Sequence, residues 1–326
     1  MCDFPVEIWS NIISHLSPQH PSAYRLGPGC SNALSGLCRI NSTFRLFAES
    51  ILYSTPYITP RNLEAFTGTV IEQGVDTNPL EFVPTVKGHL VKRLAIAEFE
   101  KLLTDEEINS IGTIFFGLRA VITHLFFDVN LPYRDWIQPI CDNDFASIRW
   151  AMQSLLNLEE FCTFERFTVW PSLRWVPAWP RLKRLAFAKS TTDGSIGETI
   201  AWIPASETCI VFPDLQRPLF ASADLVNHHL TSETPKRVMV FLPKNQAEDY
   251  TSMRNLWEVT PSHLNGDAML KAMNEYLKVV ELPDRPSAAP GVAREETMHF
   301  RSAVIDGQIW DAEGTTWGAY TSSMRR

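Results

Sequence analysis

The chain opens on a segment whose apolar residues recur with helical spacing. Within residues 5–16 they form one unusually wide stripe, made of Ile8, Trp9, Ile12, Ile13 and Leu16. Pro5 suits the first helical position, because that position needs no N–H. The pattern predicts an amphipathic helix over residues 5–16. One neighbouring element is too narrow to cover so broad a stripe, so we expect part of it to await a partner.

Two further helices are predicted after a loop rich in Pro, Gly and Ser at residues 17–31. Helical spacing returns at residues 34–38 and again at residues 44–51. The Asn41-Ser42-Thr43 triplet fits a glycosylation sequon, but its place between the two apolar segments favours a helix cap. So small a three-helix unit buries a poor fraction of its apolar surface and should pack on a neighbour.

These residues carry a family resemblance: FPVEIWSNIISHLS, followed by LCRINSTFRLFAESILYS, resembles an F-box. The matching positions are Phe4, Pro5, Glu7, Ile8, Ile12, Leu37, Ile40, Asn41, Phe44, Phe47, Ala48, Leu52 and Tyr53. Phe4 stands where the family usually has leucine, and the connecting loop is longer than the family norm. The resemblance covers residues 4 to about 58.

The resemblance implies docking onto the Skp-family adaptor of a cullin-RING ubiquitin ligase, with the wide apolar face serving as a helix-in-groove surface. The residues expected to contact the adaptor are Phe4, Pro5, Ile8, Ile12 and Leu16. Leu37, Phe44 and Ile51 are expected to hold the three helices together.

Beyond residue 58 the pattern changes to short strand-like runs separated by longer segments. The runs share an apolar-x-x-apolar-x-apolar form: Val91-Leu94-Ile96, Ile122-Leu125-Phe127, Leu182-Leu185-Phe187 and, less well, Leu158-Phe161-Thr163. PKRVMVF at 235–241 is similar. Their starts at 91, 122, 158 and 182 are unevenly spaced, which is typical of a degenerate leucine-rich repeat rather than a regular one.

Helices are predicted between these runs, at 60–73 and 144–156. Alternating strands and helices predict an α/β fold with a parallel sheet, for which a horseshoe and a doubly wound sheet are both possible. We favour an irregular horseshoe. The expected domains are a helical domain at 1–58, a leucine-rich-repeat-like domain at 59–282, and a linker, small hairpin and frayed end at 283–326.

Period-2 alternation places the matched apolar residues inward and their neighbours outward, on the concave face where horseshoe proteins bind. From these outward positions the candidate target-binding residues are Arg93, His124, Phe126, Glu160, Arg184, Arg237 and Met239. A lattice of basic residues would suit an acidic peptide or degron. Solvated strand ends are the alternative at any single position.

Three features near the middle and end of the chain predict further structure. Five tryptophans, at 150, 170, 175, 179 and 202, crowd one region, and core packing is favoured over exposed binding. GDAMLKAMNEYLKVVEL, residues 266–282, predicts a helix before a Pro- and Ala-rich linker. Asp306-Gly307 between two apolar runs predicts a small hairpin.

Composition narrows the function further. The 326 residues are 45% hydrophobic and 20% charged, as in folded proteins, and the net charge of −8 argues against a nucleic-acid surface. No membrane span or signal peptide is indicated. The six scattered cysteines suit neither a disulfide framework nor a zinc site. We therefore expect a cytoplasmic or nuclear protein without a cofactor.

The sequence lacks the common phosphate, dinucleotide, zinc and acyl-transfer motifs. His228-His229 has no ligand partners at suitable spacing, and Asp193-Gly194-Ser195 lacks the lysine of a phosphate loop. The expected function is a non-catalytic, target-recognising subunit of an SCF-type ubiquitin ligase, whose contribution is proximity. The alternatives are an interaction scaffold without a ubiquitination role and an enzyme with a dispersed active site.

Overall fold

The structure is a computed structural model, which describes residues 5–18, 20–27, 29–73, 82–129, 148, 151–163, 179–188, 208–212, 237–243, 277–282, 300–316 and 319. The chain divides into two compact units. Unit 1 comprises residues 1–158 and 302–310, and unit 2 comprises residues 159–301 and 311–326. The helical segment expected as a separate domain at 1–58 therefore belongs to the same compact unit as the first strands.

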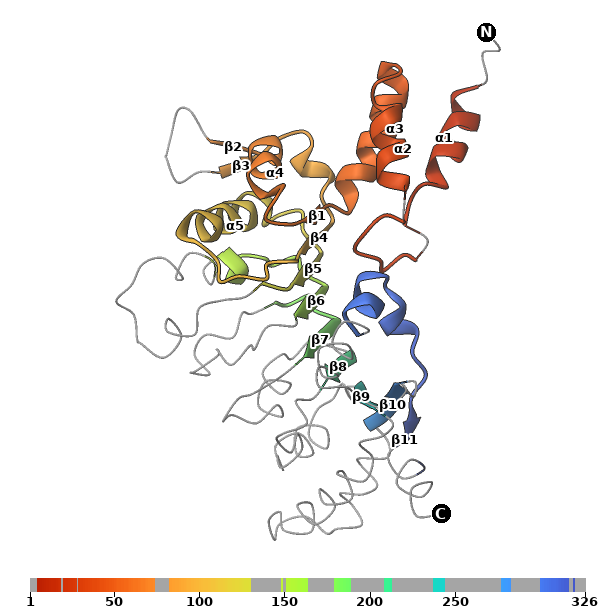
Figure 1. Ribbon diagram of the computed structural model, residues 1–326, viewed down its shortest axis with the longest axis vertical. Helices are drawn as coiled ribbons and strands as arrows, with labels where there is room; N and C mark the ends of the chain where they lie inside the picture. The colour runs from red at the N-terminus through yellow and green to blue at the C-terminus, as the bar shows by residue number, and fades with distance from the viewer. Residues whose placement is uncertain are drawn as a thin grey trace. The chain divides into compact units, whose positions relative to one another are not determined.

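Unit 1 begins with a bundle of three helices: α1 (Val6–Ser14), α2 (Cys30–Leu37) and α3 (Ser42–Ser54) (Figure 1). Its core is formed by one buried residue from each helix, Ile13, Leu34 and Ala48. Trp9 meets Phe44 edge to face, with ring centroids 4.9 Å apart. Around this core pack the partly buried residues Leu16, Leu26, Leu37, Cys38, Phe44, Phe47, Ile51 and Leu52. The three predicted helices are confirmed, and so is the packing of Leu37, Phe44 and Ile51 between them.

Local signals set the ends of these helices. Pro5 is the residue before the first helical position of α1, so the helix begins one residue later than predicted. The Oδ1 atom of Asn41 accepts a hydrogen bond of 2.8 Å from the Phe44 amide, which confirms the predicted cap on α3. Gly29 before α2 has a φ of 81°, a conformation that favours glycine.

Three parallel strands follow in unit 1, in the order β1 (Tyr57–Ile58), β4 (Arg93–Ile96) and β5 (His124–Phe127). Two helices pack beside them, α4 (Leu63–Val70) and α5 (Asp105–Leu118). A capping box begins α5, in which Thr104 and Glu107 satisfy each other's backbone N–H groups. The Phe115 and Phe127 ring centroids lie 5.7 Å apart, so α5 covers the strand face that carries Phe127.

The other elements of unit 1 are short: an antiparallel pair of strands, β2 (Ile71–Gln73) and β3 (Phe82–Pro84), and the 3-10 turn η1 (Gly88–Leu90). The predicted helix at 60–73 is thus confirmed only for its central part, because residues 71–73 are extended. Residues 151–153 are helical, inside the helix predicted at 144–156.

Unit 2 contributes six strands, which pair in chain order: β6 (Glu160–Thr163), β7 (Arg184–Ala188), β8 (Thr208–Phe212), β9 (Arg237–Pro243), β10 (Leu277–Leu282) and β11 (Thr315–Thr316). Among the strand pairs described within unit 2, all are parallel except that of β10 with β11. The predicted α/β class with a parallel sheet is therefore confirmed.

Two predictions for the C-terminal third are wrong. Residues 277–282 form strand β10, not the end of a helix over 266–282, whose first part lies outside the described residues. Residues 300–305 are helical and the 3-10 turn η5 (Gln308–Asp311) follows, so Asp306-Gly307 ends a helix instead of joining a hairpin. The predicted linker at 283–296 lies outside the described residues.

Candidate protein-interaction surfaces

The α1 helix keeps apolar side chains at its surface while a neighbouring side of the helix packs into the bundle. Val6, Ile8 and Ile12 are 51%, 42% and 52% exposed, whereas Ile13 is 1% exposed. Ile8 and Ile12 lie one turn apart on the same side of the helix. We call Ile8 and Ile12 the α1 stripe, since Val6, six residues before Ile12, lies on another side of the helix. Large apolar side chains that share one exposed face are typical of a docking surface.

The remaining predicted adaptor contacts are distributed differently. Pro5 is exposed and adjoins the α1 stripe. Leu16 is half-buried against the bundle core, so its first role is to hold the helices together. Phe4 lies outside the described residues.

An ion pair links the three-helix bundle to the turn before β4. Nζ of Lys87 lies 3.1 Å from the Glu49 carboxylate of α3 and 5.1 Å from the centre of the Tyr53 ring. The hydrogen bond to Glu49 raises the pKa of Lys87. Burial, followed by the charge of Glu49, raises the pKa of the nearby Cys38 thiol.

Strands β4 and β5 have two unlike faces, set by the two-residue period of a strand. Leu94, Ile96, Leu125 and Phe127 lie on the face toward α5, and all four are 0% exposed, which confirms their predicted inward orientation. The opposite face carries Arg93, Ala95, His124 and Phe126, and strand pairing sets Arg93 beside His124 and Ala95 beside Phe126. We call it the Phe126 face.

The expectation that this opposite face meets solvent is wrong at Phe126 and Ala95, which are both 0% exposed. Parallel sheets are usually covered on both sides, and this part follows that rule. Over Phe126 the cover comes from the loop between α1 and α2. Tyr24, itself 0% exposed, sets its ring 5.7 Å from that of Phe126.

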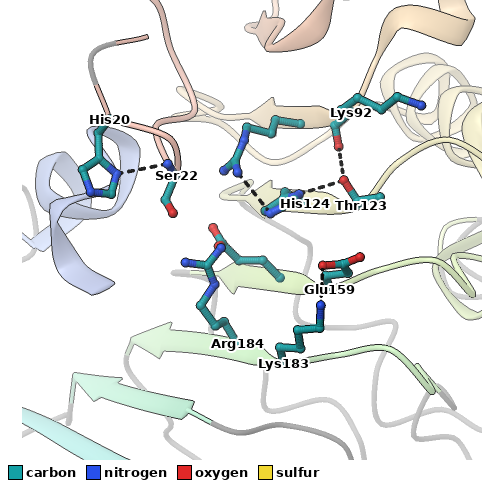
Figure 2. Close-up of polar contacts among 10 residues, drawn as sticks. His20, Ser22, Lys92, Thr123, His124, Glu159, Lys183 and Arg184 are labelled. Carbon is teal, nitrogen blue, oxygen red and sulfur yellow. Dashed lines mark hydrogen bonds and ion pairs between the residues drawn. The ribbon is translucent and has the colours of Figure 1, made fainter. Parts of the chain in front are cut away.

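At the edge of the Phe126 face, polar residues form a chain of hydrogen bonds that Figure 2 shows. Nη2 of Arg93 lies 3.1 Å from Nε2 of His124, and Nδ1 of His124 lies 2.8 Å from Oγ1 of Thr123. Because arginine can only donate, His124 accepts at Nε2 and carries its proton on Nδ1. Thr123 then donates to the Lys92 carbonyl oxygen at 3.1 Å. The imidazole is thereby held in one orientation between Arg93 and Thr123.

In unit 2 the starts of β6 and β7 are joined by two ion pairs. Nη2 of Arg184 lies 2.7 Å from Oε2 of Glu160, whose side chain is 0% exposed. Next to it, Nζ of Lys183 lies 2.9 Å from Oε2 of Glu159 at the surface (Figure 2). Glu160 was expected to face solvent, and that expectation is wrong: its carboxylate is buried and charge-paired.

Backbone pairing brings the remaining candidates of unit 2 into register. Glu160 pairs with Arg184, Arg184 with Thr208, and Thr208 with Arg237. Met239 pairs with Ile210 two residues further along. The repeat alignment thus located equivalent strand positions. Arg93, His124 and Arg184 are the candidates with partly exposed side chains among those whose burial the structure describes.

Sequence reasoning missed two residues that shape these surfaces, Tyr24 and Thr123. Tyr24 lies in a segment of Pro, Gly and Ser that reads as a plain loop, and its only signal is an aromatic side chain among turn residues. Thr123 precedes the strand and is recognisable only once the His124 tautomer is known. The predicted core role of the tryptophans is confirmed at Trp179, which is 3% exposed and packs on Phe161; the other four lie outside the described residues.

Within the part of the chain that the structure describes, three or more His, Cys, Asp or Glu side chains nowhere gather as a metal site would require. The described helices include none that is both long and apolar enough to cross a membrane. Comparisons with protein-family models, with curated proteins and with solved structures find no match for this chain.

Proposed function

We propose that this protein is a target-recognising subunit of a cullin-RING ubiquitin ligase. In this proposal the bundle α1–α3 is an F-box that binds a Skp-family adaptor, and the α/β region after residue 58 holds a protein target. The chain supplies no acid, base or nucleophile. Its contribution is to raise the effective concentration of the target near the ubiquitin-loaded enzyme.

The observation that carries the proposal is the contrast in exposure between two neighbouring residues of α1. Ile13 fills the bundle core at 1% exposure, while the neighbouring Ile12 stays 52% exposed. An apolar side chain of that size gains about 1.5–3 kcal/mol when it is fully buried, so two uncovered isoleucines leave a substantial gain to a partner. The sequence resemblance of residues 4–58 to the F-box indicates which partner.

The test is recovery of a Skp-family adaptor by the full chain. Ile8→Asp and Ile12→Asp place charge on the α1 stripe, and each should abolish recovery, because a carboxylate in an apolar groove loses its hydration without a partner. Val86→Asp is the matched control, since Val86 is an apolar residue 85% exposed outside the bundle. It should leave recovery unchanged.

Two results contradict parts of the proposal. If the wild-type chain recovers no adaptor under conditions in which another F-box protein does, the bundle is not an F-box. If adaptor is recovered but no co-purifying protein gains ubiquitin when the ligase is reconstituted, the chain is an interaction scaffold and not a ligase subunit. Leu16 is unsuitable for this test, because its half-buried position would confuse loss of docking with loss of packing.

A further inference from the structure

The loop between α1 and α2 is held in place by a segment that is far away in the sequence. The backbone N–H of Tyr24 donates to the Ile305 carbonyl oxygen at 2.6 Å. Nε of Arg25 lies 3.1 Å from Oδ1 of Asp306. Both contacts lie within unit 1, where residues 302–310 return beside residues 20–27, as the blue segment near the loop in Figure 1 shows.

The fit between the two segments is close at Gly307. Its φ is 79°, and a Cβ at this position would lie against Nδ1 of His20, 2.6 Å from the carbonyl carbon of Ser22 and 2.7 Å from the Ala23 nitrogen. Backbone cannot yield cheaply at such distances. The Nδ1 atom of His20 in turn accepts from the Ser22 N–H at 3.0 Å (Figure 2), which fixes the turn that faces the glycine.

The loop held in this way occupies the Phe126 face. Ser22, Ala23 and Tyr24 are 4%, 5% and 0% exposed, which is unusual for a segment of turn residues at the surface. Tyr24 contacts Phe126, and in the returning segment Val304 and Ile309 are 0% and 1% exposed. The chain therefore fills, with its own residues, the strand face on which a horseshoe protein would receive a target.

We propose that residues 20–27, pinned by residues 302–310, form a built-in latch that closes the Phe126 face to outside proteins. Release of the latch uncovers the apolar side chain of Phe126. The ion pair between the latch and the returning segment is partly exposed: the side chains of Arg25 and Asp306 are 48% and 40% exposed. Because residues 20–27 form turns and bends without helix or strand, we expect them to open locally at lower cost than the sheet beneath them.

The chain offers a matched pair of variants for the test. Gly307→Ala adds a methyl group both at positive φ and against the latch, whereas Gly29→Ala adds one at a φ of 81° with nothing within 4 Å. The difference between them isolates the close approach. Hydrogen exchange on the full chain should show the Tyr24 amide and the β5 amides exchanging roughly tenfold faster in Gly307→Ala than in Gly29→Ala, as overpacking of this kind implies.

A dye that binds apolar surface, anilinonaphthalene sulfonate, should bind more to Gly307→Ala than to Gly29→Ala at unchanged far-ultraviolet circular dichroism. Equal exchange and equal dye binding in the two variants would overturn the proposal. The latch is tested by hydrogen exchange and dye binding, whereas the ligase proposal is tested by adaptor recovery. Either proposal can therefore fail without the other.

A charge swap decides the matter should Gly307→Ala fail to fold. Arg25→Asp opposes Asp306 with a like charge and should speed exchange at Tyr24, and adding Asp306→Arg should restore the slow rate. If the double variant exchanges as fast as the single one, the two segments do not hold each other and the latch is disproved.

Discussion

Two neighbouring ion pairs at the start of β6 and β7 differ mainly in burial. Arg184 is paired with the fully buried Glu160, and Lys183 with the half-exposed Glu159. Arg184→Met should lower the free energy of unfolding by about 3 kcal/mol, because it leaves a carboxylate in the interior without this cation. Lys183→Met should change it by less than about 1 kcal/mol. Urea denaturation monitored by circular dichroism measures both.

Equal losses in the two methionine variants would show that Glu160 is satisfied without Arg184. The conservative change Glu160→Gln provides the second half of the comparison. Glu160→Gln removes the buried charge, so no cation is needed to neutralise it. Arg184→Met should therefore lower the free energy of unfolding by less in the Glu160→Gln background than in the wild type.

Lys87 gives the bundle a predictable response to alkaline pH. Its pKa is raised above the ordinary 10.5 by the hydrogen bond to Glu49. A raised pKa in the folded state means that the stabilisation is fully present below pH 10.5 and is lost as the pH rises through the higher folded value. The gap in melting temperature between the wild type and Lys87→Met should therefore be constant up to about pH 10 and close above it.

A gap that persists at the highest pH would mean that Lys87 stabilises through its methylene stem on Tyr53 and not through its charge. Methionine keeps most of that stem, which is why it is the appropriate replacement.

At the residue scale, the sequence predicted the register of the strands better than the burial of their side chains. The repeat alignment put Arg93 and His124 at equivalent strand positions, and strand pairing confirms them as direct neighbours. It could not foresee that Phe126 is buried, because the covering ring comes from Tyr24, about a hundred residues earlier in the chain. Period-2 alternation separates the faces of a strand, but what covers each face is decided by distant segments.

Within α1, truncation of two adjacent isoleucines should change the free energy of unfolding by very different amounts. Ile13→Ala removes a side chain from the bundle core and should cost about 2–4 kcal/mol. Ile12→Ala removes an exposed one and should change stability by no more than about 0.5 kcal/mol. Thermal unfolding measures both. If Ile12→Ala destabilises as much as Ile13→Ala, the α1 stripe packs on its own chain and is not a docking surface.

At the element scale, the wrong predictions concern segments whose sequence suits two kinds of secondary structure. LKVVEL at 277–282 suits a helix by spacing, yet it contains two β-branched residues and pairs with β9 along its whole length, so tertiary pairing decides in favour of a strand. Asp306-Gly307 is equally suitable for a hairpin and for the end of a helix, since both place glycine at positive φ. The cap at Asn41 was predictable, because a cap depends only on the next three residues.

For the whole molecule, chain order does not follow the compact units. The chain leaves unit 1 after residue 158 and returns to it for residues 302–310. Local sequence patterns contain no trace of this return, because every signal used to predict elements spans only a few turns or strands. The predicted α/β class did not require it, since class follows from the alternation of elements alone.

The return makes the stability of unit 1 depend on residues near the other end of the chain. Ending the chain after Arg301 removes Val304, Ile305 and Ile309, which belong to unit 1 and are 0%, 4% and 1% exposed. Each is worth about 1.5–3 kcal/mol when buried. Ending the chain after Asp311 keeps all three and removes only β11 from the described strands.

The shorter chain should therefore expose Tyr24 and unfold at markedly lower urea concentration, while the chain ending at Asp311 should keep the wild-type midpoint for unit 1. Slow hydrogen exchange of the β4 and β5 amides reports unit 1 directly, whatever happens to unit 2. If these amides are equally protected in both truncated chains, residues 302–310 do not stabilise unit 1. In that case residues 20–27 cover Phe126 without help from the returning segment.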